Sequence, residues 1–258
     1  MFYQSEGLQL YFEDHGNENA KTIIFIHGFP FDHSMWDEQV EVMSENYRVI
    51  VYDIRGHGIS DGGDFQFTTH HLVEDLNNLI TNLGLQQVYL CGLSMGGYLA
   101  LQYAGKYPDN IKGIILADSK AEPDGNKNKD ARYTDIKLVK EKGVKEFAIE
   151  FSKKVVHGED ANILSRLENM ILLCSPQSIT ATLIALAARP DNTDVLMNLS
   201  VPTLIITGEY DKLIPLEAVE LMLKQNINIQ SQIIENVGHV SNLENPQKFN
   251  EIVISFLG

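Results

Sequence analysis

The segment Gly92–Gly97, which reads GLSMGG, carries the clearest chemical signal in the chain. It matches the pattern G-x-S-x-G, directly after an apolar run that predicts a strand and at the start of a predicted helix. The turn between such elements is tight, so Gly92 and Gly96 relieve backbone clashes and the Ser94 hydroxyl projects outward. The start of the helix supplies unpaired N–H groups and the positive end of a dipole beside it. This context predicts a nucleophilic serine.

A serine hydroxyl is a weak nucleophile unless a base takes its proton. Of the eight histidines, only His239 follows both Ser94 and a plausible acid, and it lies just past the last predicted strand. Loops at the carboxyl ends of parallel strands are where open α/β sheets place function. We expect surface positions or helix ends for His15, His33, His70, His71 and His157, and a turn for His57.

The third member of such a site is an acid that fixes the tautomer of the imidazole. Asp211 ends the segment Thr207–Asp211, just after a predicted strand. It gives the chain order serine, aspartate, histidine that is typical of the G-x-S-x-G sites. Asp118, at the end of an earlier predicted strand, is the rival acid, and Glu209 is a weaker third option.

Two backbone N–H groups are needed to stabilise the negative charge that develops on a carbonyl oxygen during attack. One should belong to Met95, the residue after the nucleophile. The other should come from the segment His27–Pro30, which follows the first buried strand. Pro30 has no N–H, so Phe29 is the expected donor.

These residues need a scaffold that brings strand ends together. Short apolar runs alternate with helical periodicity, which predicts a mostly parallel sheet with helices on both faces. A hairpin over residues 3–14, with its turn near Glu6 and Gly7, should precede the alternating part. The predicted strands are Thr22–His27, Tyr47–Asp53, Gln87–Leu93, Ile111–Asp118, Thr203–Thr207 and Ser231–Val237.

Helices are predicted from apolar spacing. Leucines, isoleucine and valine between Leu72 and Leu83 form one stripe, with Thr68 or Thr69 to begin the helix and Gly84 to end it. The last helix should begin near Pro246 and bury Phe249 and Phe256. Trp36 begins a further helical pattern and faces either the core or a pocket.

Residues 120–200 break the alternation because they contain no convincing strand. A polar segment over residues 122–129 opens this stretch, and helical patterns follow at Val144–Val156, Ile163–Leu173 and Ile179–Ala188. We therefore predict a helical lid, residues 120–200, inserted after the sixth strand. The core should then consist of residues 1–119 and 201–258.

Composition narrows the function classes. The net charge of −15 repels phosphate backbones, so we expect no nucleic-acid partner. No HExxH, P-loop or GxGxxG motif is present, so we expect neither a metal nor a cofactor. Cys91 and Cys174 are interpreted as small buried apolar residues.

The first residues lack the features of a signal peptide and no apolar run is long enough to span a bilayer, so we expect a cytoplasmic protein with no membrane partner. The sequence does not indicate an oligomeric state.

The segments described above make the chain similar to the α/β-hydrolase superfamily over nearly its whole length. Two further stretches, Leu116–Asp124 and Ala187–Asp191, resemble small bacterial carboxylesterases and 3-oxoadipate enol-lactonases. The resemblance implies an α/β-hydrolase fold and a catalytic triad of Ser94, Asp211 and His239. The dehalogenase relatives use an aspartate nucleophile, so Ser94 argues against dehalogenation.

Together these observations predict a serine hydrolase that cleaves a small carboxylic ester or lactone through an acyl-enzyme on Ser94. One alternative is a carbon–carbon bond hydrolase or lyase acting on an anionic substrate, which would need basic residues such as Lys120, Arg132 or Arg189 facing Ser94. Another is a ligand-sensing signalling protein that keeps the triad without using it for turnover.

Overall fold

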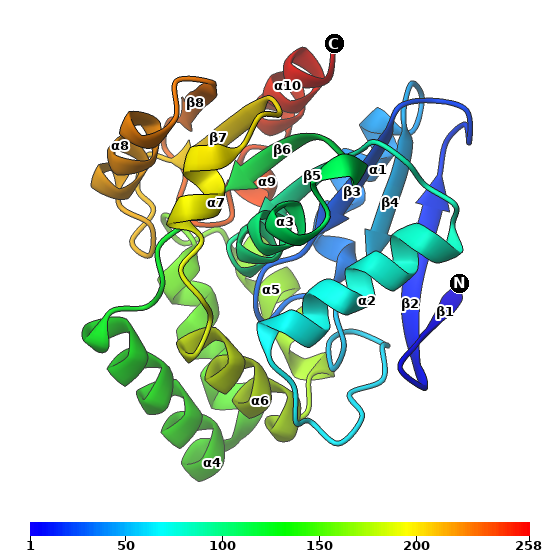
Figure 1. The fold of residues 1–258 in the computed structure, drawn as a ribbon. Coiled ribbons are helices and arrows are strands. Elements are labelled where there is room, and N and C mark those ends of the chain that lie inside the picture. Colours follow the sequence, from blue (N-terminus) through cyan, green and yellow to red (C-terminus); the bar gives the residue numbers. More distant parts are fainter.

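The computed structural model describes all residues, 1–258, and contains one sheet of eight strands (Figure 1). Their order in the sheet is β1-β2-β4-β3-β5-β6-β7-β8. The pairs β1–β2 and β2–β4 are antiparallel and the others are parallel. The strands are β1 (Phe2–Ser5), β2 (Leu8–His15), β3 (Thr22–Ile26), β4 (Arg48–Tyr52), β5 (Val88–Leu93), β6 (Ile111–Ala117), β7 (Thr203–Gly208) and β8 (Ile229–Ile234).

The strands near the middle of the sheet are apolar because both of their faces are covered. Every residue of β5 and β7 is buried, whereas β8 at the edge is mostly exposed on one side. The predicted hairpin at the start of the chain is confirmed, with Glu6 and Gly7 both at positive φ in its turn.

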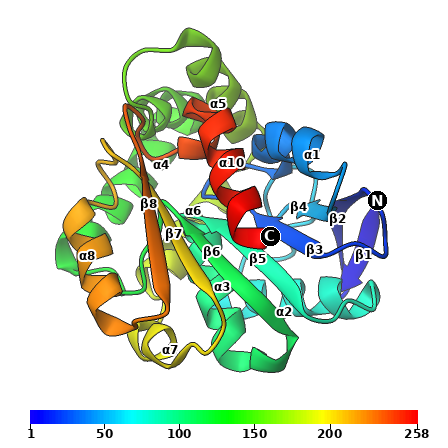
Figure 2. The ribbon, with the colours of Figure 1, turned by 90° about the horizontal axis from the view of Figure 1, so that it is seen from above.

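Ten α-helices surround the sheet. Figure 2 shows α2, α3 and α7 on one side of it and α1 and α10 on the other. The predicted ends of α2 are confirmed, since Thr68 is its N-cap residue and Gly84, at φ 62°, follows its last turn. The helices are α1 (Asp37–Met43), α2 (Thr69–Asn82), α3 (Met95–Lys106), α4 (Asn126–Val155), α5 (Ala161–Leu173), α6 (Pro176–Ala187), α7 (Thr193–Asn198), α8 (Leu216–Gln225), α9 (Ser241–Glu244) and α10 (Pro246–Leu257).

Residues 120–200 fold into α4 to α7, and Figure 1 shows α4, α5 and α6 grouped beyond one end of the sheet. Their buried side chains, such as Phe147, Leu167 and Leu183, belong to the same apolar cluster as the sheet. The inserted segment therefore packs as a continuation of the core. Its role as a lid stays a prediction.

Two sequence-based boundaries are wrong. Helix α4 begins at Asn126, inside the segment predicted as a polar loop, and its helical backbone is interrupted only at Gly143 (φ 85°, ψ 173°). The first half of α4 buries only Ile136 and Val139, so it has too few apolar residues to produce a readable stripe. Strand β8 spans Ile229–Ile234 instead of Ser231–Val237, because the chain leaves the sheet before Asn236, which has φ 60°.

Several single residues settle within the core. Trp36 is fully buried against Phe25 and Phe249, so it faces the core and not the cavity described below. Cys91 and Cys174 are buried free thiols, as expected. No single helix is both long and apolar enough to cross a membrane; α5 and α6 reach that length and composition only as a pair bent by 98°.

Candidate active site

Ser94 lies at the junction of β5 and α3, in a strained turn. Its backbone adopts φ 52° and ψ −110°, and its N–H donates to the Ala117 carbonyl (2.8 Å). A Cβ at Gly92 would overlap the Gly96 carbonyl, and a Cβ at Gly96 would overlap the Ile26 carbonyl. Only glycine fits at these two positions, and the half-buried Ser94 is held at the carboxyl end of the central strand.

His239 follows β8, and Asp211 follows β7. The His239 Nδ1 and the Asp211 Oδ2 lie 2.7 Å apart, and both side chains are almost fully buried. The other carboxylate oxygen of Asp211 accepts the N–H groups of Leu213 (2.7 Å) and Ile214 (3.0 Å). Asp211 is thus fixed by its own loop and accepts a hydrogen bond from Nδ1–H, which leaves Nε2 as the basic nitrogen of the imidazole.

The electrostatic surroundings favour a protonated His239. Burial alone would lower the pKa of His239, but the carboxylates of Asp211, Asp118 and Glu244 outweigh burial and raise it above its ordinary value. Such surroundings would stabilise an imidazolium at His239 if this side chain took up a proton.

The two alternative acids contact other groups. Asp118 accepts the N–H of Gly208 (2.8 Å) and the hydroxyl of Ser241 (2.5 Å), and it makes no hydrogen bond to His239. Burial and the nearby Asp211 raise the pKa of Asp118 to about 8. Glu209 is exposed and accepts the N–H of Asn236 (2.9 Å). Of the three candidate acids, only Asp211 contacts His239.

Phe29, Ser94, Met95 and His239 line one cavity of about 100 Å³. The amides of Phe29 and Met95 donate none of the turn, loop or cap hydrogen bonds between backbone groups. The Phe29 loop is held from behind by His27, whose Nε2 accepts the Ile54 N–H (2.9 Å). Burial lowers the pKa of His27 to about 3, so this imidazole is neutral. All four predicted residues thus border the same space, with Asp211 behind His239.

The remaining walls of the cavity come mostly from residues 120–200. Lys120 and Arg132, two of the three basic residues proposed from the sequence, line it together with Lys154. Arg189, the third, does not line the cavity. Sequence reasoning missed the apolar walls, because they depend on how α3, the inserted helices and the loop after β7 pack together. These walls are formed by Tyr98, Phe151, Leu183, Leu186, Leu213 and Ile214.

Arg189 instead belongs to an ion-pair cluster whose other members, Asp124 and Arg132, line the cavity. Its Nη1 lies 2.6 Å from Asp124 Oδ1, and its guanidinium lies over the Tyr98 ring at 4.0 Å. Arg132 pairs with the other oxygen of Asp124. Because one carboxylate serves both arginines, the cluster keeps a net positive charge beside the cavity. Lys120 makes no ion pair.

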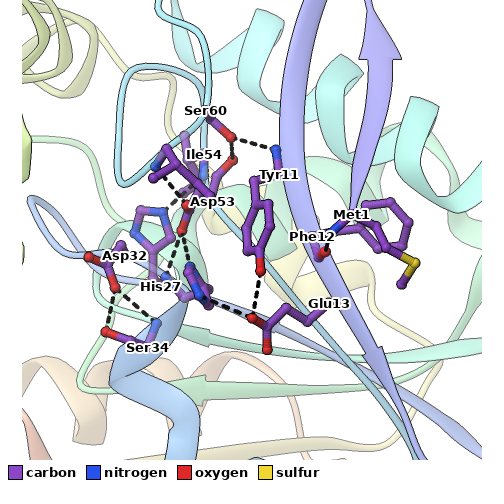
Figure 3. A network of polar contacts seen from close by, with 12 residues as sticks. Met1, Tyr11, Phe12, Glu13, His27, Asp32, Ser34, Asp53, Ile54 and Ser60 are labelled. Carbon is purple, nitrogen blue, oxygen red and sulfur yellow. Dashed lines mark hydrogen bonds and ion pairs between the residues drawn. The ribbon is translucent and has the colours of Figure 1, made fainter.

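The turn-rich segment after β4 is fixed by two buried carboxylates. Asp53 accepts the backbone and ring N–H of His33 and the N–H of Ile59. Its carbonyl accepts the Ser60 hydroxyl (Figure 3). Arg55, in the same segment, makes a buried ion pair with Asp75 at 2.5 Å.

The ligand-type atoms of Asp32, His33 and Asp53 lie within 4.8 Å of one another. They are already engaged, because His33 Nδ1 is hydrogen-bonded to Asp53 (2.7 Å) and Asp32 accepts the N–H and hydroxyl of Ser34 (Figure 3). We therefore interpret this group as a loop anchor behind the site.

Comparison with known proteins shows which family the chain belongs to. Residues 21–246 match the family described as the alpha/beta hydrolase fold. The chain is 30% identical to 3-oxoadipate enol-lactonase 1 of Acinetobacter baylyi, over all of this chain and 96% of the relative. It is also 30% identical to a putative non-heme chloroperoxidase of Synechocystis, over 98% of this chain and 96% of the relative.

Among solved structures, a thermophilic esterase from Thermogutta terrifontis, studied with malate bound, superposes with a TM-score of 0.92 at 33% identity. The match covers 99% of this chain and 96% of the esterase. The family match spans most of the chain, and the enol-lactonase relative is 30% identical over all of it. The chain therefore belongs to the α/β-hydrolase fold family.

Proposed function

We propose that this protein hydrolyses a small carboxylic ester or lactone through an acyl-enzyme on Ser94. The observation that carries the proposal is the set of groups around one cavity: the Ser94 hydroxyl, the His239 imidazole fixed by Asp211 (2.7 Å), and the Phe29 and Met95 amides. Each is needed for acyl transfer, and no simpler role requires all of them.

In the proposed reaction, His239 Nε2 takes the Ser94 proton while the serine oxygen attacks the substrate carbonyl carbon. Negative charge develops on the carbonyl oxygen, where the amides of Phe29 and Met95 stabilise it; each such donor is worth about 3 kcal/mol. The carbon–oxygen bond breaks and the alkoxide leaves with the proton from His239. A water molecule, deprotonated by His239, then attacks the acyl-enzyme, releases the acid and restores Ser94.

The relatives support this chemistry. One is named a 3-oxoadipate enol-lactonase and another an esterase. The cavity volume of about 100 Å³ is below the roughly 300–1,000 Å³ typical of drug-sized ligands, so we expect a small acyl or lactone group.

An anionic substrate is the second candidate, and the basic residues of the cavity favour it. Lys120 and Arg132 line the same space as Ser94 in a chain whose net charge is −15. Burial lowers the pKa of Lys120, so an anion that approaches its ammonium group would help keep it charged. The same basic residues would suit a carbon–carbon bond hydrolase or lyase acting on an anion. A signalling role remains the non-enzymatic alternative.

The test is turnover of a panel containing p-nitrophenyl esters of increasing acyl length, simple lactones and a hemisuccinate ester, with native protein, Ser94→Ala and Lys120→Met. Ser94→Ala should reduce ester turnover by on the order of 10⁶. Lys120→Met should raise KM for the hemisuccinate and leave the neutral acetate ester unchanged. Undiminished turnover by Ser94→Ala would refute the proposal, and an acyl-enzyme burst with no further turnover would favour the sensor.

A further inference from the structure

The end of α4 is hydrogen-bonded to the loop that carries His239. The backbone N–H of His239 donates to the Val155 carbonyl (2.8 Å), at the last residue of α4. Just beyond, the N–H of His157 donates to Glu244 Oε2 (2.7 Å). The other oxygen of Glu244, Oε1, accepts the N–H of Gly238 (2.9 Å). One carboxylate thus joins the inserted segment to the residue before His239.

Two further contacts close this junction. The His157 ring is stacked on the Tyr210 ring, with centroids 4.1 Å apart and planes inclined by 11°. Tyr210 precedes Asp211, and its N–H donates to the Val237 carbonyl (2.9 Å). A Cβ at Gly238 would lie 2.8 Å from both the His157 nitrogen and the Val155 oxygen. The acid loop, the histidine loop and the end of α4 therefore pack as one unit.

We infer that Glu244 is a positioning residue, which ties the end of α4 to the Gly238–His239 loop and so holds the imidazole of His239 in place relative to Ser94. This inference rests on the function proposed above. Glu244 makes no contact with the cavity, so it acts only through His239.

A carboxylate is required for this tie because it offers two acceptor oxygens to two backbone donors. A glutamine has one carbonyl oxygen, and its amide would direct N–H groups at the second donor. Glutamate also affects the charge balance of the loop. Burial raises the pKa of Glu244, opposed by its backbone hydrogen bonds and by His157. The charged groups with the largest effect on the pKa of His239 are Asp211 after β7, Asp118 after β6 and Glu244 on α9, and all three favour its protonated form. Further charged groups line the same cavity; they are Lys120, Asp124, Arg132, Asp135 and Lys154.

The tie also divides the inserted segment. The second half of α4, residues 144–155, is bound to the histidine loop and belongs to the fixed frame of the site. The first half, which contributes Asn128, Ala131 and Arg132 to the cavity wall, is separated from it by the non-helical Gly143.

The experiment compares Glu244→Gln with the matched control Glu209→Gln. Glu209 accepts a single backbone N–H near the same loop, that of Asn236, but it is exposed and lies outside the junction. Glu244→Gln should lower kcat for p-nitrophenyl acetate about tenfold with little change in KM, as expected for one charged hydrogen bond. The midpoint of the acid limb of kcat/KM should move to lower pH, because one of the carboxylates that raise the pKa of His239 is removed. Glu209→Gln should change neither quantity.

Amide hydrogen exchange gives a readout that does not depend on turnover. In Glu244→Gln, the amide of Gly238 or of His157 should exchange faster, because only one of them keeps its acceptor. Glu244→Asp, which keeps the charge but shortens the reach, should also speed exchange. The tie would be overturned if both amides exchanged at the rate of the native protein. This result does not depend on whether Ser94→Ala supports or disproves the proposed hydrolysis. Faster exchange together with an unmoved acid limb and unchanged kcat would overturn the positioning role.

Discussion

Replacing Asp211 with asparagine should reverse the tautomer of His239. In the native site, Asp211 Oδ1 accepts the amides of Leu213 and Ile214, and Oδ2 faces His239 Nδ1. An asparagine has one oxygen for these two tasks. If its oxygen keeps both backbone amides, its NH₂ group faces Nδ1, which must then be unprotonated. The proton moves to Nε2, and His239 can no longer accept a proton from Ser94.

The size of the effect follows from the same contacts. The productive orientation, with the asparagine oxygen on Nδ1, leaves two largely buried amides without an acceptor, at about 1–3 kcal/mol each. It therefore lies about 2–6 kcal/mol above the unproductive one. At 1.36 kcal/mol per tenfold change in rate, kcat should fall by about 30-fold to 10⁴-fold. The fold should be retained, because the asparagine fills the same volume.

The assay is kcat for p-nitrophenyl acetate at pH 8, measured for Asp211→Asn and for Asp118→Asn. The second variant removes the rival acid, which contacts Gly208 and Ser241 but not His239, so its loss of rate should be smaller. A rate for Asp211→Asn within a few-fold of the native protein would refute the tautomer argument. A greater loss in Asp118→Asn than in Asp211→Asn would transfer the orienting role to Asp118.

Two further predictions concern stability. Arg189→Met should lower the free energy of unfolding by about 3 kcal/mol, because Asp124 then keeps only Arg132 as a partner and the Glu122 carbonyl loses its donor; urea denaturation measures this, and a loss below about 1 kcal/mol would contradict it. Gly92→Ala should destabilise the protein by about 3 kcal/mol or more, since the added methyl group meets the Gly96 backbone. Gly125→Ala is its control, because a Cβ there meets nothing within 4 Å and the φ of −72° suits alanine; equal melting temperatures for the two variants would contradict the packing argument.

Local patterns in the sequence were sufficient for most of the sheet and for the residues at its edge. Strands β5 and β7 read as apolar runs because both of their faces are buried, and such runs need no knowledge of their neighbours. The turn around Ser94 was readable because its glycines are required by contacts within a few residues of chain or with the adjacent strand. The order of Ser94, Asp211 and His239 follows from their places at strand ends.

Local patterns failed where packing between distant segments decides the structure. The first half of α4 is largely exposed and carries no apolar stripe, so the sequence predicted a loop there. The choice among Asp211, Asp118 and Glu209 was open because all three follow strands that end near one another, and spacing along the chain does not give the direction of a side chain.

The sequence by itself determined the fold class and pointed to Ser94 and His239 as the candidate nucleophile and base, because each depends on a short segment whose residues interact with one another. Only the tertiary structure decided that the carboxylate of residue 211 contacts His239, that Lys120 and Arg132 reach the cavity, and that Glu244 joins α4 to the histidine loop. Such contacts join residues that are distant in the chain: 28 positions separate Asp211 from His239, and 87 separate His157 from Glu244. Their geometry is set by how whole helices pack, which no local pattern specifies.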